Sequence, residues 1–246
     1  MKKLPEADAL GDKYTVRSLR FAVAAIVAMA KLGDASLAPI VFHLATLADP
    51  KDADAGADLR VFAATALSYV TAPGVAGAVK ETLSDRNSEV IEAGLRSALY
   101  LGRIQEGDAI MEVIRRGGKV AEIATWYLEA WSGEHPTGTD KRVTKTELDK
   151  WWSGVGAKFS PGVCYRSGKP IDLKSLVAKV ADDPLHLRDE LRIHTGAACF
   201  HERLRGNPVS KPERAEVTAW WKAHSSDFPP GKLFRWGRTF EPSAVD

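Results

Sequence analysis

Residues 88–102 read Ser-Glu-Val-Ile-Glu-Ala-Gly-Leu-Arg-Ser-Ala-Leu-Tyr-Leu-Gly, and this stretch sets the pattern of the first half of the chain. Its apolar side chains recur three and four residues apart, the spacing that places them on one face of an α-helix. Gly102 follows as a residue that ends helices. We therefore expect a helix over Ser88–Leu101 with one buried face.

The same alternation of helix and break recurs along residues 15–133. Helix-ending positions fall at Gly33, Thr71, Gly102 and Gly133, at intervals of 38, 31 and 31 residues. The first interval is longer because residues 48–56 form a polar loop insertion. Two helices per unit at this period are typical of an α-solenoid, an all-α fold. The expected helices span residues 15–32, 37–47, 59–70, 75–83, 88–101, 107–116 and 120–131.

Small side chains are concentrated in the first helix of each unit, where they let neighbouring helices approach closely. They are Ala22, Ala24, Ala25, Ala28, Ala30, Ala63, Ala64, Ala66, Ala93, Gly94 and Ala98. Asp34, Asp85 and Asp108 lie near the junctions, where an Asp side chain is suited to cap a helix. Residues 23–40, 61–79 and 90–110 resemble bacterial HEAT repeats, a resemblance that covers about residues 15–133. It implies an array of helical hairpins, most often a protein-binding scaffold, with a few nucleic-acid-binding and catalytic exceptions.

The second half contains a tandem duplication. A helix ending in two tryptophans is followed by Phe-x-Pro-Gly and then by aromatic-Arg-x-Gly-basic, and both copies keep every spacing at an offset of 69 residues. Eight of the 22 aligned positions are identical. The identical pairs are Glu147/Glu216, Trp151/Trp220, Trp152/Trp221, Phe159/Phe228, Pro161/Pro230, Gly162/Gly231, Arg166/Arg235 and Gly168/Gly237. Two further helices, at residues 173–180 and 184–203, are expected between the copies.

We expect each copy to form an aromatic clasp. The segment after the Pro-Gly turn is too short and too glycine-broken for a helix, so it should lie extended over a helix end with its aromatic ring on a Trp or Phe. The basic residues would project outward, or an Arg would stack on a Trp face. The clasp either seals the end of the helical stack or binds a partner, because Tyr, Trp and Arg dominate binding hot spots. The partner-binding candidates are Trp152, Tyr165, Arg166, Lys169, Trp221, Phe234, Arg235, Trp236 and Arg238.

HEAT repeats followed by Trp-rich helices and a Phe-x-x-Gly-x-x-aromatic-Arg-x-Gly-basic segment resemble a bacterial HEAT-repeat family of unassigned activity. Members are often encoded near type VI secretion components. The resemblance implies an adaptor, accessory or toxin-neutralising protein, and it carries over no catalytic residues. We divide the chain into a HEAT-like array at 1–133, a linker at 134–143, and the duplicated helical units at 144–246, which continue the solenoid.

Composition favours a soluble cytoplasmic protein, and the charge balance does not favour a nucleic-acid-binding one. The chain has 246 residues, 45% of them hydrophobic, and only two cysteines, which suits a reducing compartment. Its longest apolar run, Phe21–Ala30, is about half of a membrane span. Residues 1–136 carry 15 basic and 18 acidic side chains, and residues 137–246 carry 19 and 14. A nucleic-acid-binding protein usually has a stronger basic bias.

No catalytic, metal or cofactor site is expected. On a continuous helix, Cys199 would lie about 140° from His194, and His201 would share the face of His194 without a third ligand. The better interpretation is partly exposed helix histidines, with Cys164 and Cys199 in the core. The alternative function is that of a nucleic-acid-binding, DNA-glycosylase-like HEAT protein. It would use Trp126, Tyr127 and Trp131, but the nearest acids are Glu122, Glu129 and Glu134, not an Asp.

Overall fold

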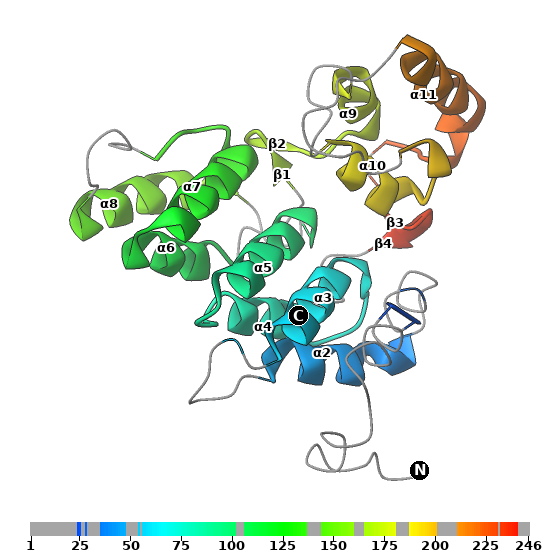
Figure 1. Ribbon diagram of the computed structural model, residues 1–246. Coiled ribbons are helices and arrows are strands. Elements are labelled where there is room, and N and C mark those ends of the chain that lie inside the picture. Colours follow the sequence, from blue (N-terminus) through cyan, green and yellow to red (C-terminus); the bar gives the residue numbers. More distant parts are fainter. Residues whose placement is uncertain are drawn as a thin grey trace, which may run out of the picture.

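The computed structural model describes residues 24–25, 28, 35–47, 54, 56–101, 106–136, 144–159, 165–180, 187–200, 211–230 and 232–240. These residues are mostly helical, with two short two-stranded hairpins, so the all-α class is confirmed (Figure 1). The helix expected at 15–32 lies outside this part of the chain, apart from Ala24, Ala25 and Ala28, which are helical. Cys164, His201 and most of residues 48–56 also lie outside it.

Helices of the first half begin and end close to where the sequence predicts. Ser88–Leu101 and Gly107–Arg116 are predicted to the residue, because apolar periodicity and glycine breaks coincide there. The described elements are α2 (Ala38–Thr46), α3 (Ala57–Ala66) with a 3₁₀ turn at Leu67–Tyr69, α4 (Val75–Thr82), α5 (Ser88–Leu101), α6 (Gly107–Arg116), α7 (Lys119–Ser132) and α8 (Lys145–Gly156). A capping box of Thr144 and Glu147 starts α8, as the helix-starting residues there predict.

Helices α3, α5 and α7 form one layer. They begin at residues 57, 88 and 119, 31 residues apart, and α5 packs against both of its neighbours (Figure 1). Helices α2, α4 and α6 pack on α3, α5 and α7 respectively. This pairing differs from the one that the predicted breaks imply, which groups α3 with α4 and α5 with α6. A short connection accounts for one of these pairs, because α6 joins α7 through only Gly117 and Gly118.

Small side chains bring the helices together, as the sequence predicts. The hydroxyl of Ser97 on α5 donates to the Ala64 carbonyl of α3 at 2.6 Å, and it lies 2.8 Å from the Ser68 hydroxyl. A Cβ added to Gly94 would lie 2.2 Å from Oγ1 of Thr82 on α4. Large side chains at these positions would force the helices apart, so the layer depends on them.

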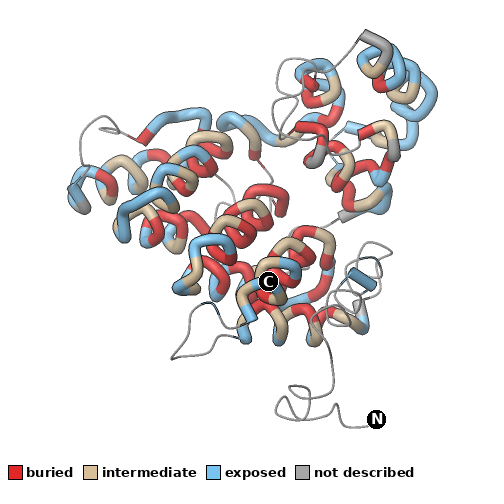
Figure 2. The backbone as a smooth tube through the Cα atoms, viewed as in Figure 1, coloured by how far each residue is buried: buried red, intermediate tan, exposed pale blue. Residues whose placement is uncertain are grey.

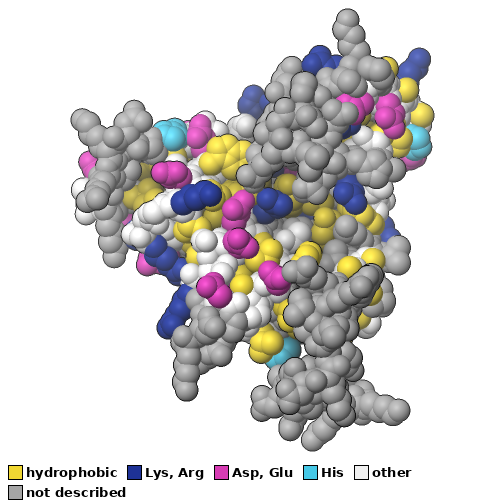
Figure 3. Space-filling model, viewed as in Figure 1, with side chains coloured by type: hydrophobic (Ala, Val, Ile, Leu, Met, Phe, Trp, Pro, Cys, Tyr) yellow, Lys and Arg dark blue, Asp and Glu magenta, His cyan; other side chains and the backbone are white. Residues whose placement is uncertain are grey.

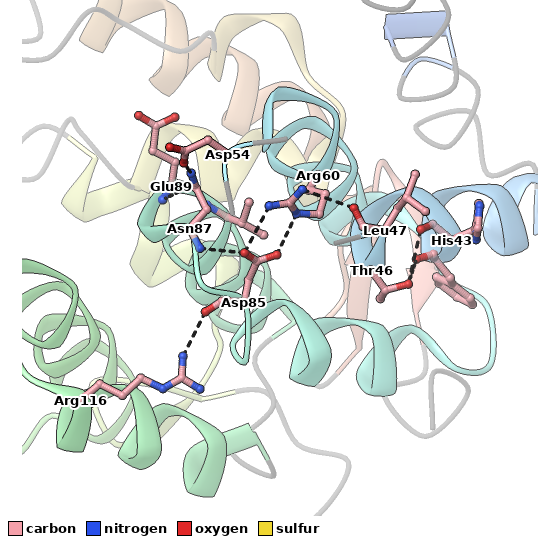
Figure 4. Close-up of polar contacts among 11 residues, drawn as sticks. His43, Thr46, Leu47, Asp54, Arg60, Asp85, Asn87, Glu89 and Arg116 are labelled. Carbon is pink, nitrogen blue, oxygen red and sulfur yellow. Dashed lines mark hydrogen bonds and ion pairs between the residues drawn. The ribbon is translucent and has the colours of Figure 1, made fainter. Parts of the chain in front are cut away.

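A buried ion pair joins three of these helices. The Arg60 guanidinium of α3 donates to the Asp85 carboxylate at 2.8 Å and to the Leu47 carbonyl at the end of α2 at 3.3 Å (Figure 4). Asp85 was expected to cap α5, but the cap is Asn87, whose side chain accepts from the Glu89 N–H at 2.9 Å. Asp85 instead accepts from the Asn87 N–H and neutralises Arg60. Asp34 lies outside the described residues.

The second half adds shorter helices and the two hairpins. Its elements are strands β1 (Tyr165–Arg166) and β2 (Lys169–Pro170), helices α9 (Leu173–Lys179) and α10 (Leu187–Thr195), a 3₁₀ turn at Ala198–Phe200, helix α11 (Lys211–His224), and strands β3 (Leu233–Arg235) and β4 (Arg238–Phe240). The single helix expected at 184–203 is wrong, because Gly196 at φ +70° ends α10. His194, expected to be partly exposed, is buried at 1%.

The two halves share a hydrophobic core. The larger buried cluster runs through α2 to α7 and includes Leu148 of α8 and Ile193 of α10 (Figure 2). A second cluster gathers around Leu191, Phe200 and Phe234. The duplicated units therefore pack against the helical layers rather than standing apart from them.

Candidate partner-binding surface

Each copy of the duplicated motif folds as a β-hairpin with a two-residue turn. Arg166 pairs with Lys169 and Arg235 with Arg238, and the residues between them all have positive φ: Ser167 50°, Gly168 72°, Trp236 53° and Gly237 76°. Two consecutive left-handed residues define a type I′ turn, which matches the twist of paired strands. The prediction that these segments are extended is confirmed.

Each hairpin turn caps the end of the helix before its Trp-Trp helix, α7 in the first copy and α10 in the second. The N–H groups of Ser167 and Gly168 donate to the Ala130 and Trp131 carbonyls at the end of α7, at 2.8 and 2.7 Å. In the second copy, the N–H groups of Trp236 and Gly237 donate to the Ile193 and His194 carbonyls at the end of α10, at 2.6 and 3.0 Å. The last carbonyls of a helix have no partner within it, so the clasp satisfies them.

In each copy, the backbone of the turn lies so close to the capped helix that only a glycine fits just after that helix. Gly133 and Gly196, just beyond α7 and α10, have φ of 69° and 70°. A Cβ on Gly133 would lie 2.7 Å from the Ser167 carbonyl carbon, and one on Gly196 would lie 3.2 Å from that of Trp236. The duplicated unit is therefore larger than the motif, and runs α7–α8–hairpin and α10–α11–hairpin. Sequence reasoning missed this, because the first Trp of each pair follows Gly133 by 18 residues but Gly196 by 24.

The two motif arginines point inward, so the prediction that they project outward is wrong. Arg166 pairs with Glu190 of α10, and their side chains are 12% and 0% exposed. Arg235 is 3% exposed and donates to the Tyr100 carbonyl of α5 and to the Phe234 carbonyl. Burial excludes direct partner contact by Arg235, and both guanidinium groups bind protein groups of this chain.

His194 lies between Arg235 and Glu190, and Glu190 pairs with Arg166. Its Nδ1 lies 2.7 Å from Nη1 of Arg235, and its Nε2 lies 3.7 Å from a Glu190 oxygen. Burial and the neighbouring Arg235 lower the pKa of His194 below its ordinary value of 6.5. Burial alone would raise the pKa of Glu190, but Arg166 and His194 outweigh it and lower that pKa to about 2. A charged Glu190 and a neutral His194 thus connect the clasps to α10 and α5; we call Arg166, Glu190, His194 and Arg235 the buried link.

The aromatic rings of the motif pack on a Phe as predicted, and this packing buries two of the partner-binding candidates, Tyr165 and Phe234. Tyr165 meets Phe159 edge to face at 4.7 Å, and Phe234 meets Phe228 at 4.9 Å. Tyr165 and Phe234 are 8% and 4% exposed, so neither presents a ring to a partner. Their rings instead hold each hairpin against the segment after its Trp-Trp helix.

Trp236 docks the second hairpin on the helical layers. Its ring meets Tyr69 edge to face at 5.2 Å, and the Arg192 guanidinium lies 5.7 Å from its ring centroid. An Arg stacked on a Trp is thus present, although the Arg comes from α10 and not from the motif. Lys169 and Arg238, the basic residues that end the two Arg-x-Gly-basic segments, are exposed.

The equivalent tryptophans Trp152 and Trp221 are used differently. Trp152 lies on Gly107 at the start of α6, so closely that a Cβ there would be 1.9 Å from its ring, and its N–H donates to Asp108 at 2.8 Å. Trp221 lines a groove of about 480 Å³ with Ile171, Leu173, Lys174, Phe228 and Lys232, among others. We call this space the Trp221 groove. Among the described residues, none accepts a hydrogen bond from the Trp221 N–H.

The described part of the chain offers little catalytic geometry. No three His, Cys, Asp or Glu side chains within it come together to hold a metal ion. Cys199 is partly buried in the second cluster, and burial raises the pKa of its thiol to about 11, so it stays protonated.

The aromatics of the glycosylase-like alternative do not form an open site. Tyr127 and Trp131 are 3% and 1% exposed, so their rings are not accessible to a base, and only Trp126 reaches the surface. Glu129 pairs with His135 at 2.8 Å. On the face in Figure 3, side chains of both charge signs are interspersed over the described residues. That distribution differs from the basic tracks that follow a nucleic-acid backbone.

Comparison of the chain with family models, curated proteins and solved structures found no match. The resemblance to HEAT-repeat and secretion-associated proteins therefore stays a prediction. None of the described helices is long and apolar enough to cross a membrane.

Proposed function

We propose that the protein is an α-solenoid of HEAT-like helical hairpins that acts as a non-enzymatic, protein-binding scaffold or adaptor in the cytoplasm. The 31-residue recurrence of α3, α5 and α7 and the second layer of α2, α4 and α6 support the architecture. Stacked repeats of this kind present extended surfaces on which partners dock.

The observation that carries the binding function is the difference between the two clasps. In the first clasp, Trp152, Tyr165 and Arg166 contact α6, Phe159 and α10. Lys169 is exposed, and Trp151 lines a separate space of about 600 Å³. The second clasp leaves Trp221 half-buried over an open groove. A purely structural cap gains nothing from an unfilled groove beside a large aromatic ring, whereas buried aromatic anchors in grooves dominate protein interfaces.

Two roles fit a scaffold of this type, an accessory of a secretion machine and a toxin-neutralising protein. Both need a stable surface and one specific partner, and neither needs a catalytic residue in this chain. The identity of the partner distinguishes them.

Affinity capture with the full chain tests the proposal. We expect the immobilised protein to retain one stoichiometric protein from a nuclease-treated lysate of its source, and Trp221→Ala to lose that partner while remaining folded. Phe62→Ala is the matched control, because Phe62 is a large apolar side chain, 45% exposed and outside the groove. Retention of nucleic acid from an untreated lysate, with no protein, would contradict the proposal in favour of the nucleic-acid-binding alternative.

A further inference from the structure

The helix that packs against each Trp-Trp helix begins with different residues in the two copies. Helix α8 packs on α6 in the first unit, and α11 packs on α9 in the second. The first two residues of α6 are Gly107 and Asp108, which make room for the Trp152 ring and accept its N–H. The first two residues of α9 are Leu173 and Lys174. Leu173 and Lys174 both line the groove, and an ammonium group cannot accept an N–H, so the start of α9 offers Trp221 neither the glycine nor the carboxylate that hold Trp152.

The walls of the groove are apolar and rigid. Trp221 stacks on Phe228, with ring centroids 6.2 Å apart and planes at 24°. Leu173 is buried on the α9 side, and Pro229 and Pro230 close the end near the turn. A space of about 480 Å³ accepts one or two side chains of an extended segment and is too small for a folded domain.

The rim of the groove is positive. Lys174 and Lys232 line the groove and are exposed, and neither forms an ion pair with another described residue. Asp172, the acid that lines the groove, accepts from the N–H groups of Lys174 and Ser175 and from the Ser175 hydroxyl. The Ser175 hydroxyl bond lowers the pKa of Asp172 against the opposing effect of burial, so this carboxylate stays charged on α9. Its donors at the start of α9 hold it, and the charge of Lys174 adds a smaller lowering of the same pKa. Two lysines against this one aspartate leave the lining of the groove with one net positive charge for a ligand.

We propose that the Trp221 groove binds a short acidic segment of the partner protein. One large apolar side chain of that segment inserts against Trp221 and Leu173, and flanking carboxylates pair with Lys174 and Lys232. This inference rests on the proposed protein-binding function and specifies the chemistry of the partner. A nucleic acid fits less well, because two lysines and one aromatic ring supply too few phosphate and stacking contacts for a strand.

A fluorescein-labelled peptide of sequence DEDFDED, mixed with the full chain at about 0.15 M salt, tests the proposal by fluorescence anisotropy. We expect a Kd of about 10–100 μM, weakened about tenfold or more when the central Phe of the peptide is replaced by Ser. The double variant Lys174→Glu/Lys232→Glu should weaken binding by a similar factor and leave the melting temperature unchanged, because both side chains are exposed. Lys222→Glu is the matched control, since Lys222 adjoins Trp221 on α11, is exposed and does not line the groove. It should change the Kd less than about twofold.

Four results would overturn the proposal: equal binding of the Phe and Ser peptides, equal loss in Lys222→Glu, tighter binding of an oligothymidylate, or a dimer that Lys174→Glu/Lys232→Glu dissociates in sedimentation. The lysate experiment separates this failure from that of the proposed function. A partner captured equally by the wild type and by Lys174→Glu/Lys232→Glu would support the proposed scaffold function and contradict binding of an acidic segment in the groove. Absence of any captured protein removes the scaffold itself.

Discussion

The two clasps have the same backbone and different surroundings. Both place a type I′ turn on a helix end, and both bury the motif arginine and the aromatic before it. They differ in the second tryptophan, which is seated on Gly107 in the first copy and lines a groove in the second. A duplicated motif can thus keep its structural contacts in both copies. The residues of the neighbouring helix determine whether the second tryptophan is packed within the protein or lines an open groove.

The largest expected effect comes from the buried link, where the two copies join. Glu190→Leu leaves Arg166 buried without its counter-charge, so we expect the free energy of unfolding to fall by about 3–5 kcal/mol. The double variant Arg166→Met/Glu190→Leu removes both charges and should recover more than half of this loss. Urea titrations measure both values. A double variant as unstable as the single one would show that the link contributes through something other than its charges.

The turn glycines compare the copies directly. A Cβ on Gly168 would lie 2.6 Å from the Ser132 carbonyl oxygen, while one on Gly237 would lie 3.1 Å from that of Thr195. Both changes strain a positive φ, and only the first adds a severe backbone clash. We expect Gly168→Ala to cost about 3 kcal/mol and Gly237→Ala about 1.5 kcal/mol, measured by urea titration. Equal losses would mean that the two turns approach their helices equally closely.

Replacing Trp152 should cost more unfolding free energy than replacing Trp221. Trp152→Ala removes the contact with Gly107 and the bond to Asp108, and we expect a loss of about 3 kcal/mol in unfolding free energy. Trp221→Ala should cost about 1 kcal/mol, because one side of this ring faces the groove. Asp108→Ala isolates the hydrogen bond, at about 1 kcal/mol. A Trp221→Ala loss as large as that of Trp152→Ala would contradict an open groove.

Acid should weaken the second clasp through His194. Its pKa is lowered in the folded state, so the unfolded chain binds the proton first, and stability is full above pH 6.5 and falls as the pH drops below that value. The slope is at most about 1.4 kcal/mol per pH unit. Glu190, with a pKa of about 2 against 4.5 when unfolded, adds a second loss below pH 4.5. Urea titrations at pH 7 and pH 5 measure the first loss. His194→Gln should flatten it, and an unchanged slope in that variant would assign the titration to another group.

The local parts of the fold could be predicted from the sequence. Periodicity and glycine fix α5 and α6 to the residue, and the Arg-x-Gly-basic spacing predicts an extended segment over a helix end. These features depend on neighbours within a few positions, and local propensity describes such neighbours well.

The fate of the candidate site residues could not be predicted in the same way. Arg166 and Arg235 are buried by partners 24 and 135 positions away, Glu190 and the Tyr100 carbonyl, and no local pattern specifies these contacts. The difference between Trp152 and Trp221 is present in the sequence, as Gly107-Asp108 against Leu173-Lys174. The consequence of this sequence difference can be inferred only once the structure shows that α6 packs on α8 and α9 on α11.

Solvent exchange of the two indole N–H groups directly tests whether Trp152 is held by α6 while Trp221 lines an open groove. In the ¹⁵N-labelled protein, Trp152→Phe and Trp221→Phe assign the two Nε1–H signals, and solvent-exchange rates can then be compared at one pH. We expect slow exchange for Trp152, whose N–H donates to Asp108, and fast exchange for Trp221 in its open groove. Equal rates, or slower exchange at Trp221, would contradict the distinction between a Trp152 held by Gly107 and Asp108 and a Trp221 that lines an open groove.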